Sequence, residues 1–342
     1  MAKSMRAGIV GASGYTGAEL VRLVEAHPVL EPALATSREF AGRPVTDVYP
    51  NLSSDLVFQE LDLAAAADLD VVFLALPHGA SMEIGAALGA GGTRVVDLSA
   101  DFRLEDAAAY PAWFGGPHTA PEVLTDWVYG LPELHRKDIE GARTVANPGC
   151  YPTAALLALA PLVRERIVDH TTIVVSAASG VSGAGRGMSA GVHFSHVDAN
   201  FKAYGIPTHK HTPEIEQELS TLAGAPVTIT FIPHLVPMPR GLLATCVASL
   251  TPGADPAATA EAFYDGEPFV RVLRDTLPET KYTAGSNHCL LGYTVDARAG
   301  RVIATAAIDN LGKGAAGQAI QNANLMLGLP ETSGLTGGGL YP

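Results

Sequence analysis

A strand, a glycine-rich turn and a helix stand near the start of this chain, and they restrict its fold more than any other segment. The stretch GIVGASGYTGAEL, residues 8–20, places glycines at Gly11, Gly14 and Gly17. Glycines permit a tight turn and close approach of a ligand to the backbone, and a helix N-terminus offers N–H groups to a phosphate. The spacing is a variant of the usual G-x-G-x-x-G. The alternative is a glycine turn that binds no ligand. The position of this turn, at the first strand of the chain, favours nucleotide binding instead.

The first third of the chain repeats this alternation of apolar strands and Ala-rich helices. Strands are expected at Arg6–Val10, Leu30–Ala35, Asp70–Leu76, Arg94–Ser99 and Ala142–Asn147, and helices at Ala18–Ala26, Leu61–Ala67 and Ala80–Ala90. Continuous apolar strands separated by helices indicate a parallel sheet covered on both faces. The pattern therefore predicts a Rossmann-type, doubly wound α/β domain.

The pattern changes after Cys150. A helix is expected at Thr153–Arg164, followed by longer β-type runs at Thr171–Ser179, Val227–Val236, Gly241–Leu250 and Arg301–Asp309. These runs predict an α+β substrate and oligomerisation domain with a largely antiparallel mixed sheet. An amphipathic helix within Gly312–Leu329 is expected to pack back on the first domain. The predicted division is 1–149 with 313–342, and 150–312.

The overall charge excludes one class of partner. The formal net charge is −13, and nonspecific nucleic-acid binding needs the opposite sign. An anionic small molecule would need a local cationic pocket. The chain shows no signal-peptide pattern and no apolar run near the ~18 to 20 residues of a membrane span. We therefore predict a cytoplasmic protein without a membrane or nucleic-acid partner.

The side chains around the glycine turn predict NADP(H) rather than NAD. Those placed to contact phosphate are Ser13, Tyr15 and Thr16. An NAD site has an acidic residue at the end of the second strand, where this chain has Ser37 and Arg38. A hydroxyl and a guanidinium suit a 2′-phosphate, which a carboxylate would repel. Glu39 follows directly and weakens the inference.

Cys150, in the segment VANPGCYPT, is the candidate nucleophile. Pro148 and Gly149 favour a turn, and a helix is expected to follow. A helix N-terminus favours the thiolate and lowers a cysteine pKa from ~8.5 toward neutrality. Cys246, within LLATCVASL, fits a buried spacer, while Cys289 is ambiguous. Three cysteines without metal-type spacing suggest neither a disulfide framework nor a zinc site.

A nucleophilic cysteine needs a partner for proton transfer. The segment HKHTPEIEQEL supplies His209 and His211 just before a helix, with Thr212 expected as its cap and Glu214 in its first turn. Either histidine fits, and Glu214 is placed to support one of them. Alternatively, the two histidines could be metal ligands. No third ligand follows at a spacing typical of a metal site, so no metal is predicted.

Three arginines are candidates for binding an anion. Arg103 and Arg186 each follow an expected strand, and Arg240 lies between two strands. Each alone is typical of a surface charge. Together at loop ends, they predict a pocket for an acidic substrate in an acidic protein.

These motifs together resemble the N-acetyl-gamma-glutamyl-phosphate reductases, which are relatives of the aspartate-semialdehyde dehydrogenases. In order along nearly the whole chain, they are GASGYTGAEL, LALPHG, SADFRL, YGLPEL, NPGCYPTA, SGVSGAGR, HKHTPEI, PRG and AIDNLGKGAAGQAIQ. The NPGCYPT and HKHTPE segments are the specific ones, because related dehydrogenases share the glycine turn.

The resemblance implies a reaction of arginine biosynthesis. The Cys150 thiolate would attack N-acetyl-L-glutamyl 5-phosphate, release inorganic phosphate, and form a thioester that hydride from NADPH reduces to the semialdehyde. His211 or His209 would be the general acid/base, with Glu214 in support. Further residues implied are Ser182, Gly183 and Asn310 for the cofactor, and Arg103, Asn147, Arg186 and Arg240 for the substrate. A homodimer or homotetramer is also implied.

Two other functions stay open at this point. One is a reductase for a different acyl phosphate, such as an aspartyl or a carrier-linked aminoadipyl phosphate. The other is a noncatalytic NADP-sensing protein that retained the fold. The substrate-side motifs favour acetylglutamate over the other acyl phosphates, and the noncatalytic protein predicts that Cys150→Ser leaves every measurable activity unchanged.

Overall fold

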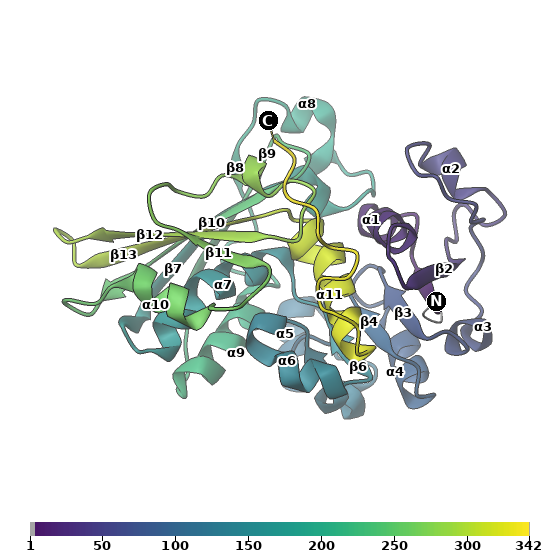
Figure 1. The fold of residues 1–342 in the computed structure, drawn as a ribbon, viewed down its shortest axis with the longest axis horizontal. Helices are drawn as coiled ribbons and strands as arrows, with labels where there is room; N and C mark the ends of the chain where they lie inside the picture. Colours follow the sequence, from purple (N-terminus) through teal and green to yellow (C-terminus); the bar gives the residue numbers. More distant parts are fainter. Residues whose placement is uncertain (1–3, 342) are drawn as a thin grey trace. The chain divides into compact units, whose positions relative to one another are not determined.

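The computed structural model describes residues 4–341, which form two compact units (Figure 1). The first unit holds the residues up to Gly149 together with Ala315–Thr336, and the second holds Cys150–Gly314 and the residues from Gly337 on. The expected division, 1–149 with 313–342 and 150–312, differs at 313–314 and at the C-terminal segment. That segment groups with the second unit because the Leu340 N–H donates to the Ala284 carbonyl at 2.8 Å and Tyr341 packs on Tyr282.

The first unit contains a six-stranded, all-parallel sheet in the order β2-β1-β3-β4-β6-β5. Its strands are β1 (Met5–Val10), β2 (Leu30–Ala35), β3 (Val71–Leu74), β4 (Val95–Asp97), β5 (Val128–Tyr129) and β6 (Thr144–Ala146). Since β2 and β3 lie on opposite sides of β1, the strand order reverses there. This topology confirms the doubly wound α/β prediction and places a ligand crevice at the carboxyl ends of β1 and β3.

Helices connect these strands. They are α1 (Tyr15–Glu25), α2 (Val45–Val48), α3 (Leu63–Ala67), α4 (Met82–Ala90), α5 (Tyr110–Phe114), α6 (Pro132–Gly141) and α11 (Gly317–Met326), with 3₁₀ turns at Ala107–Ala109 and Pro121–Asp126. The sequence pattern missed β5, α5 and α6. Two-residue and five-residue elements are too short to show a hydrophobic period, and the mean hydropathy of α6 is low.

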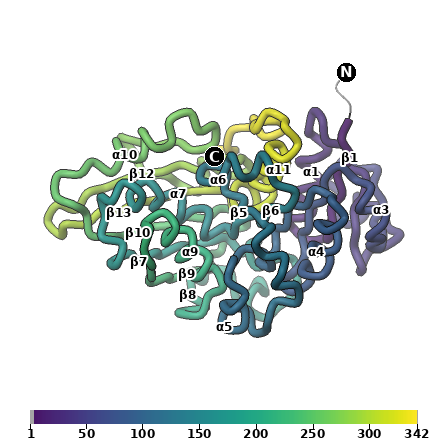
Figure 2. The backbone as a smooth tube through the Cα atoms, turned by 90° about the horizontal axis from the view of Figure 1, so that it is seen from below, coloured from purple at the N-terminus to yellow at the C-terminus, as the bar shows by residue number. Residues whose placement is uncertain are grey.

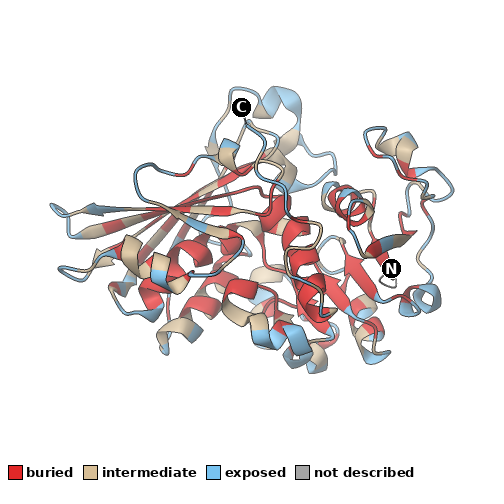
Figure 3. Ribbon diagram, in the orientation of Figure 1, coloured by how far each residue is buried: buried red, intermediate tan, exposed pale blue. Residues whose placement is uncertain are grey.

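The helix α11 differs from the amphipathic helix that the sequence predicts. A π-helical turn at Gly312–Ala316 precedes it, and each of its ten residues is buried (Figure 3). Two of its side-chain amides donate inside the first unit: Gln318 Nε2 and Asn322 Nδ2 both donate to the Gly130 carbonyl, at 3.0 and 2.8 Å. These N–H donors offset part of the cost of burying polar side chains without a solvent face.

The second unit contains a seven-stranded sheet in the order β11-β12-β13-β10-β7-β9-β8. Its strands are β7 (Val168–Gly180), β8 (Lys202–Ala203), β9 (Thr230–Val236), β10 (Leu242–Leu250), β11 (Val270–Leu273), β12 (Cys289–Asp296) and β13 (Arg301–Ile308). The β11–β12 and β7–β9 pairs are parallel, and the other pairs are antiparallel. The prediction of a largely antiparallel mixed sheet is therefore confirmed.

The helix α7 (Cys150–Arg164) packs against β7, β10 and β13 (Figure 2). The other helices of this unit are α8 (Phe194–Val197), α9 (Thr212–Ala223) and α10 (Pro256–Phe263), with 3₁₀ turns at Val181–Ala184, Ala190–Val192 and Thr280–Tyr282. Pro161 lies inside α7 and removes the N–H that would bond the Leu157 carbonyl. The Tyr264 hydroxyl donates to that carbonyl instead, at 2.8 Å.

The two faces of the second sheet are buried to different degrees. Val175, Ala177, Ala244, Cys246 and Ala304 alternate along β7, β10 and β13 and are fully or almost fully buried. The side chains between them are only partly buried; they include Val174, Ser176, Leu243, Thr245, Val247 and Ile303. We call this second set the open face of the sheet.

Candidate active site

The glycine turn of the first unit is built for close backbone packing. Gly11 directly follows β1 and has φ +86°, and a Cβ placed there would lie 2.4 Å from the carbonyl oxygen of Ala75, just after β3. A Cβ at Gly17 would lie 2.3 Å from the Gly11 carbonyl oxygen. Gly14 is the N-cap of α1 and provides no side-chain cap. The uncapped N-terminus of α1 at the strand-order reversal fits a dinucleotide phosphate.

Hydroxyl groups line the same turn. The Ser37 hydroxyl donates to the Ser13 hydroxyl at 2.9 Å, and Thr36 Oγ1 accepts from the Gly11 N–H at 3.1 Å. Arg38 is exposed beside them. Two adjacent hydroxyls and a nearby guanidinium are groups that can donate to a phosphate of a nucleotide.

Tyr15 and Thr16 occupy the first turn of α1 and reach solvent to different extents. Tyr15 is exposed, with 40% of its surface accessible, and Thr16 is half-buried. The backbone of Ser13 is fixed by Tyr49, whose hydroxyl donates to the Ser13 carbonyl at 2.7 Å. The phosphate-contacting roles of Ser13, Tyr15 and Thr16 stay predictions.

Arg103 and Asn147 are buried rather than displayed on the surface. The Arg103 side chain donates from Nε to the Asn147 carbonyl at 2.8 Å and from Nη2 to the Leu98 carbonyl at 2.9 Å. The Asn147 amide accepts from Asn322 Nδ2 at 3.0 Å and donates to the Ala315 carbonyl at 3.2 Å. These contacts join the loops that follow β4 and β6, and the substrate-binding roles of both residues stay predictions.

In the second unit, Cys150 is the first residue of α7. The helix therefore starts three residues before the predicted Thr153, and Cys150 itself is half-buried. A Cβ at Gly314 would lie 2.8 Å from the Cys150 Cβ. The glycine lets the π-helical turn approach the cysteine this closely.

Aromatic rings gather beside this helix start. The Tyr151 ring lies 5.6 Å from the His209 ring and 5.9 Å from the His211 ring, and the two histidines are 4.8 Å apart. Tyr204 and Phe231 also pack on His209, at 5.4 and 5.3 Å. We call these five residues the aromatic cluster. The sequence predicted its two histidines but missed the other three members. Tyr151 lies within NPGCYPT but was given no role, and Tyr204 and Phe231 lie outside the quoted motifs.

The hydroxyls of the cluster form a short chain. Tyr204 donates to the Tyr151 hydroxyl at 3.2 Å, and Tyr151 donates to the His234 carbonyl at 2.8 Å. Burial raises the pKa of Tyr204 to about 12; the hydrogen bond with Tyr151 opposes the rise and the charge of the Cys150 thiolate adds to it. Burial also raises the pKa of Tyr151, with the charges of Tyr204 and Cys150 adding to it. Both phenols are therefore neutral at pH 7.

The two histidines differ in their surroundings. Burial, helped by the charge of Lys210, lowers the pKa of His209 to about 4. His209 Nδ1 accepts the backbone N–H of His211 at 3.1 Å, so the neutral ring carries its proton on Nε2. His211 is the N-cap of α9, and Thr212 is its first residue rather than the predicted cap. Glu214 is buried in the first turn of α9, and its supporting role stays a prediction.

A second polar group lies at the ends of β10 and β13. Arg240 Nε donates to both carboxylate oxygens of the buried Asp309, at 3.2 and 2.9 Å. Asn310 donates to the Ser182 hydroxyl at 2.8 Å and accepts the Gly241 N–H at 2.7 Å. Three predicted residues, Ser182, Asn310 and Arg240, are thus brought together. Gly183 and Arg186 are exposed residues of the same loop as Ser182.

The remaining cysteines are buried and unpaired with each other. Burial raises the pKa of Cys246 to about 12, so its thiol is protonated at neutral pH and fits the spacer interpretation. Cys289 starts β12 and is fully buried. Neither shares the helix-start position of Cys150.

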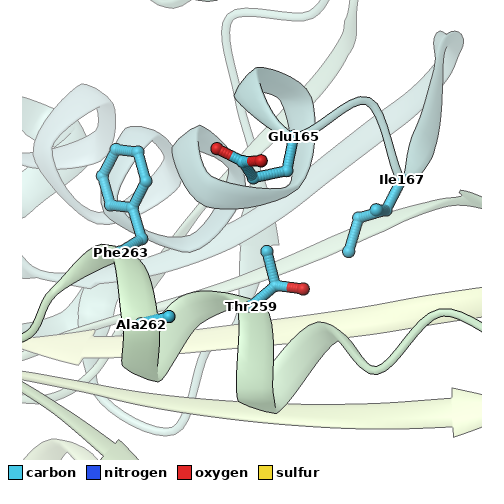
Figure 4. A pocket seen from close by; sticks show the side chains of 5 residues that line it. All are labelled: Glu165, Ile167, Thr259, Ala262 and Phe263. Carbon is cyan, nitrogen blue, oxygen red and sulfur yellow. The ribbon is translucent and has the colours of Figure 1, made fainter.

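A hollow of about 420 Å³ lies elsewhere in the second unit, between α10 and the end of α7 (Figure 4). Its lining residues are Glu165, Ile167, Thr259, Ala262 and Phe263. At about 1.5 Å per helical residue, it lies roughly 22 Å along α7 from Cys150. It contains no predicted site residue.

Within residues 4–341, no helix is long and apolar enough to cross a bilayer. The same residues contain no group of three or more His, Cys, Asp or Glu side chains arranged to hold a metal ion.

Comparison with known proteins matches both units to family models. Residues 6–142 match "Semialdehyde dehydrogenase, NAD binding domain", and residues 150–310 match "Semialdehyde dehydrogenase, dimerisation domain". Among solved structures, aspartate semialdehyde dehydrogenase II of Vibrio cholerae has a TM-score of 0.73 at 17% identity, covering 95% of this chain and 99% of that one. The Candida albicans enzyme with NADP has a TM-score of 0.70 at 17% identity, covering 95% and 99%. These structures share the fold.

Curated relatives are much more similar in sequence. Proteins named N-acetyl-gamma-glutamyl-phosphate reductase from Pelotomaculum thermopropionicum and Symbiobacterium thermophilum are 50% and 53% identical, each over 99% of this chain and 100% of the relative. The resemblance predicted from the motifs is therefore confirmed. The chain belongs to the N-acetyl-gamma-glutamyl-phosphate reductase family, whose members are oxidoreductases, and it is built from the two semialdehyde dehydrogenase domains.

Proposed function

We propose that this chain catalyses the NADPH-dependent reductive dephosphorylation of N-acetyl-L-glutamyl 5-phosphate to N-acetyl-L-glutamate 5-semialdehyde, a step of arginine biosynthesis. The observation that carries this proposal is the position of Cys150, the first residue of α7, next to Tyr151, whose ring packs on both His209 and His211. The names of the close relatives supply the substrate.

The first half of the reaction uses the thiolate. Cys150 Sγ attacks the acyl carbon, the bond from that carbon to the phosphate oxygen breaks, and inorganic phosphate leaves. The N-terminal end of the α7 dipole favours the thiolate, and a thioester retains a carbonyl that can accept hydride. We propose that the Cys150 backbone N–H, which lies beside the nucleophile at the start of α7, stabilises the oxyanion that forms on the acyl oxygen.

The second half reduces the thioester. When bound, the cofactor supplies hydride to the thioester carbon; the carbon–sulfur bond then breaks to give the aldehyde and the Cys150 thiolate. We assign the proton transfers to His211, supported by Glu214. His209 is neutral, and its Nδ1 already accepts the backbone N–H of His211. We therefore assign it a structural role, fixing the His211 backbone, rather than proton transfer.

Cationic side chains are proposed to bind the anionic groups of the substrate. Arg240 is fixed by Asp309, which preorganises its guanidinium, and Arg186 is exposed on the loop after β7. Arg103 and Asn147, in the loops after β4 and β6, are also proposed to bind the substrate. Ser182, Gly183 and Asn310 are proposed to border the nicotinamide.

NADP(H) is proposed as the cofactor in preference to NAD(H). The support is the pair of hydroxyls from Ser13 and Ser37 beside the exposed Arg38. Replacing Arg38 by Ala is expected to weaken NADPH binding about tenfold and to leave NADH binding unchanged, since only NADPH carries the 2′-phosphate. Equal losses for both nucleotides would contradict the assignment.

We propose a homodimer or homotetramer that buries the open face of the second sheet. That face carries Val174, Leu243, Val247 and Ile303 only partly covered, in the unit that matches a dimerisation domain. The substitution Val247→Arg is expected to lower the molar mass measured by light scattering; an unchanged mass would contradict the use of this face. The cytoplasmic location stays a prediction.

The test of substrate choice is run in the direction of acyl phosphate formation. Phosphate-dependent reduction of NADP⁺ is measured with N-acetyl-L-glutamate 5-semialdehyde and with L-aspartate 4-semialdehyde. We expect kcat/KM for the acetylated substrate to exceed the other by at least about a hundredfold, since an unmatched polar or charged group costs several kcal/mol. Equal or reversed values would exclude the proposed substrate.

A further inference from the structure

A buried carboxylate and a histidine lie together in the first unit, outside the residues assigned above. Asp101 is fully buried, and its Oδ1 lies 2.5 Å from Nδ1 of His78. The same carboxylate accepts the backbone N–H groups of Gly79 at 2.7 Å and Ser81 at 2.9 Å. Burial raises the pKa of Asp101, but these hydrogen bonds, with that of His78 first, lower it below its ordinary value overall. Asp101 is therefore an ionised acceptor that fixes both His78 and the backbone around it.

This arrangement leaves one edge of the His78 ring accessible. Its Nδ1 atom is buried, and the Phe114 ring packs against the His78 ring at a tilt of 32° with centroids 4.5 Å apart, yet 23% of the His78 side chain is exposed. Asp101 Oδ1 lies against Nδ1, so Nε2 is the ring nitrogen left to meet a ligand. With the ring proton on Nδ1, Nε2 is a hydrogen-bond acceptor. A histidine that only filled space would not need an ionised, buried partner to set its tautomer.

The loop that carries His78 adjoins the glycine turn. It follows β3, and a Cβ at Gly11 would meet Ala75 and Leu76 of this loop at 2.4 and 3.1 Å. In a doubly wound sheet, the end of the second strand takes the adenosine ribose and the helix N-terminus takes the diphosphate. Here β2 and β3 lie on opposite sides of β1, so the nicotinamide half of a dinucleotide extends over the end of β3, toward His78.

We propose that His78 is a cofactor-binding residue, whose Nε2 accepts a hydrogen bond from a donor on the nicotinamide nucleoside, either a ribose hydroxyl or the carboxamide N–H. The diphosphate offers no such donor, which is why the proposal names the nucleoside. Asp101 is the positioning residue that sets the His78 tautomer. The inference rests on the proposed use of NADP(H).

The test separates the two nitrogens of His78. In His78→Asn the amide nitrogen takes the place of Nδ1, so the Asp101 partner is retained while the Nε2 acceptor is lost. We expect an unchanged melting temperature and an NADPH dissociation constant about tenfold higher, measured by fluorescence titration. Adenosine 2′,5′-bisphosphate, which is only the adenosine half, should bind His78→Asn and the wild type equally.

Control variants make each outcome informative. His78→Gln retains an acceptor near the Nε2 position and should recover part of the NADPH affinity, which a purely structural role would not predict. Arg38→Ala should weaken both ligands, because both carry the 2′-phosphate. Unchanged NADPH affinity in His78→Asn, or equal weakening of NADPH and the bisphosphate, would overturn the assignment of His78. A wild-type protein that binds neither ligand would instead overturn the proposed cofactor, and this inference with it.

Discussion

The glycine turn of the first unit and the aromatic cluster of the second unit are built in opposite ways. The turn is one continuous stretch, Gly11–Gly17, and its function depends on backbone geometry and the absence of side chains. The aromatic cluster joins segments at Tyr151, Tyr204–His211 and Phe231, and its properties depend on which side chains surround each ring. The comparison teaches that a site made by backbone is visible in a local motif, whereas a site made by packing is not.

The largest expected effect belongs to the chemistry at Cys150. Cys150→Ser should lower kcat on the order of 10⁴-fold and leave NADPH affinity unchanged, because the alcohol is not ionised at neutral pH. Steady-state kinetics and a binding titration check both parts. Cys246→Ser is the matched control: it should retain kcat but lose stability, since it places a hydroxyl in the core. Retained turnover in Cys150→Ser would contradict the assignment of Cys150 as the nucleophile.

The next effect tests the backbone nature of the glycine turn. Gly11→Ala should reduce the free energy of unfolding by about 3 kcal/mol, combining a positive φ with a collision against the Ala75 carbonyl. Gly115→Ala is the control, because Gly115 has φ +81° but nothing within 4 Å of its Cβ position. It should cost about 1 to 2 kcal/mol. If denaturant unfolding gives equal losses, the close packing of the turn is not what requires glycine.

A smaller effect concerns His209 and the pH dependence of stability. The pKa of His209 is lowered from 6.5 to about 4, so the unfolded chain binds more protons between these values. Stability should therefore fall by about 2 kcal/mol as the pH drops from 6.5 to 4, a figure reduced for partial exposure. His209→Gln should flatten this part of the curve. Lys210→Gln should reduce the slope only in part, because burial is the larger cause; an unchanged slope in His209→Gln would contradict the assignment.

The smallest effect concerns the helix that carries Cys150. Tyr264→Phe should cost about 1 to 2 kcal/mol, because the Leu157 carbonyl opposite Pro161 loses its donor. Tyr293→Phe is the control: Tyr293 donates to the Ala158 carbonyl at 3.0 Å, but the N–H of Leu162 remains as a helical donor to that oxygen. Thermal unfolding should show the smaller loss for Tyr293→Phe. The reverse order would mean that Tyr264 does not compensate for the missing N–H of Pro161.

The sequence by itself determined the elements whose signals are local. Continuous apolar runs predicted five of the first unit's strands, the glycine spacing predicted the turn at Gly11, and NPGCYPT predicted a cysteine at a helix start. These features depend on the backbone conformation of neighbouring residues, which residue type biases directly. The same locality explains why the short strand β5 and the polar helix α6 were not predicted.

Only the tertiary structure determined which distant groups meet and what that contact does to them. It placed Tyr204 and Phe231 on His209, buried Arg103 against the Asn147 carbonyl, buried α11 on all sides, and paired His78 with Asp101. It also distinguished the neutral His209 from the helix-capping His211, which the sequence treated alike. Burial and hydrogen-bond geometry set charge states and tautomers, and both arise from contacts between residues far apart in the chain.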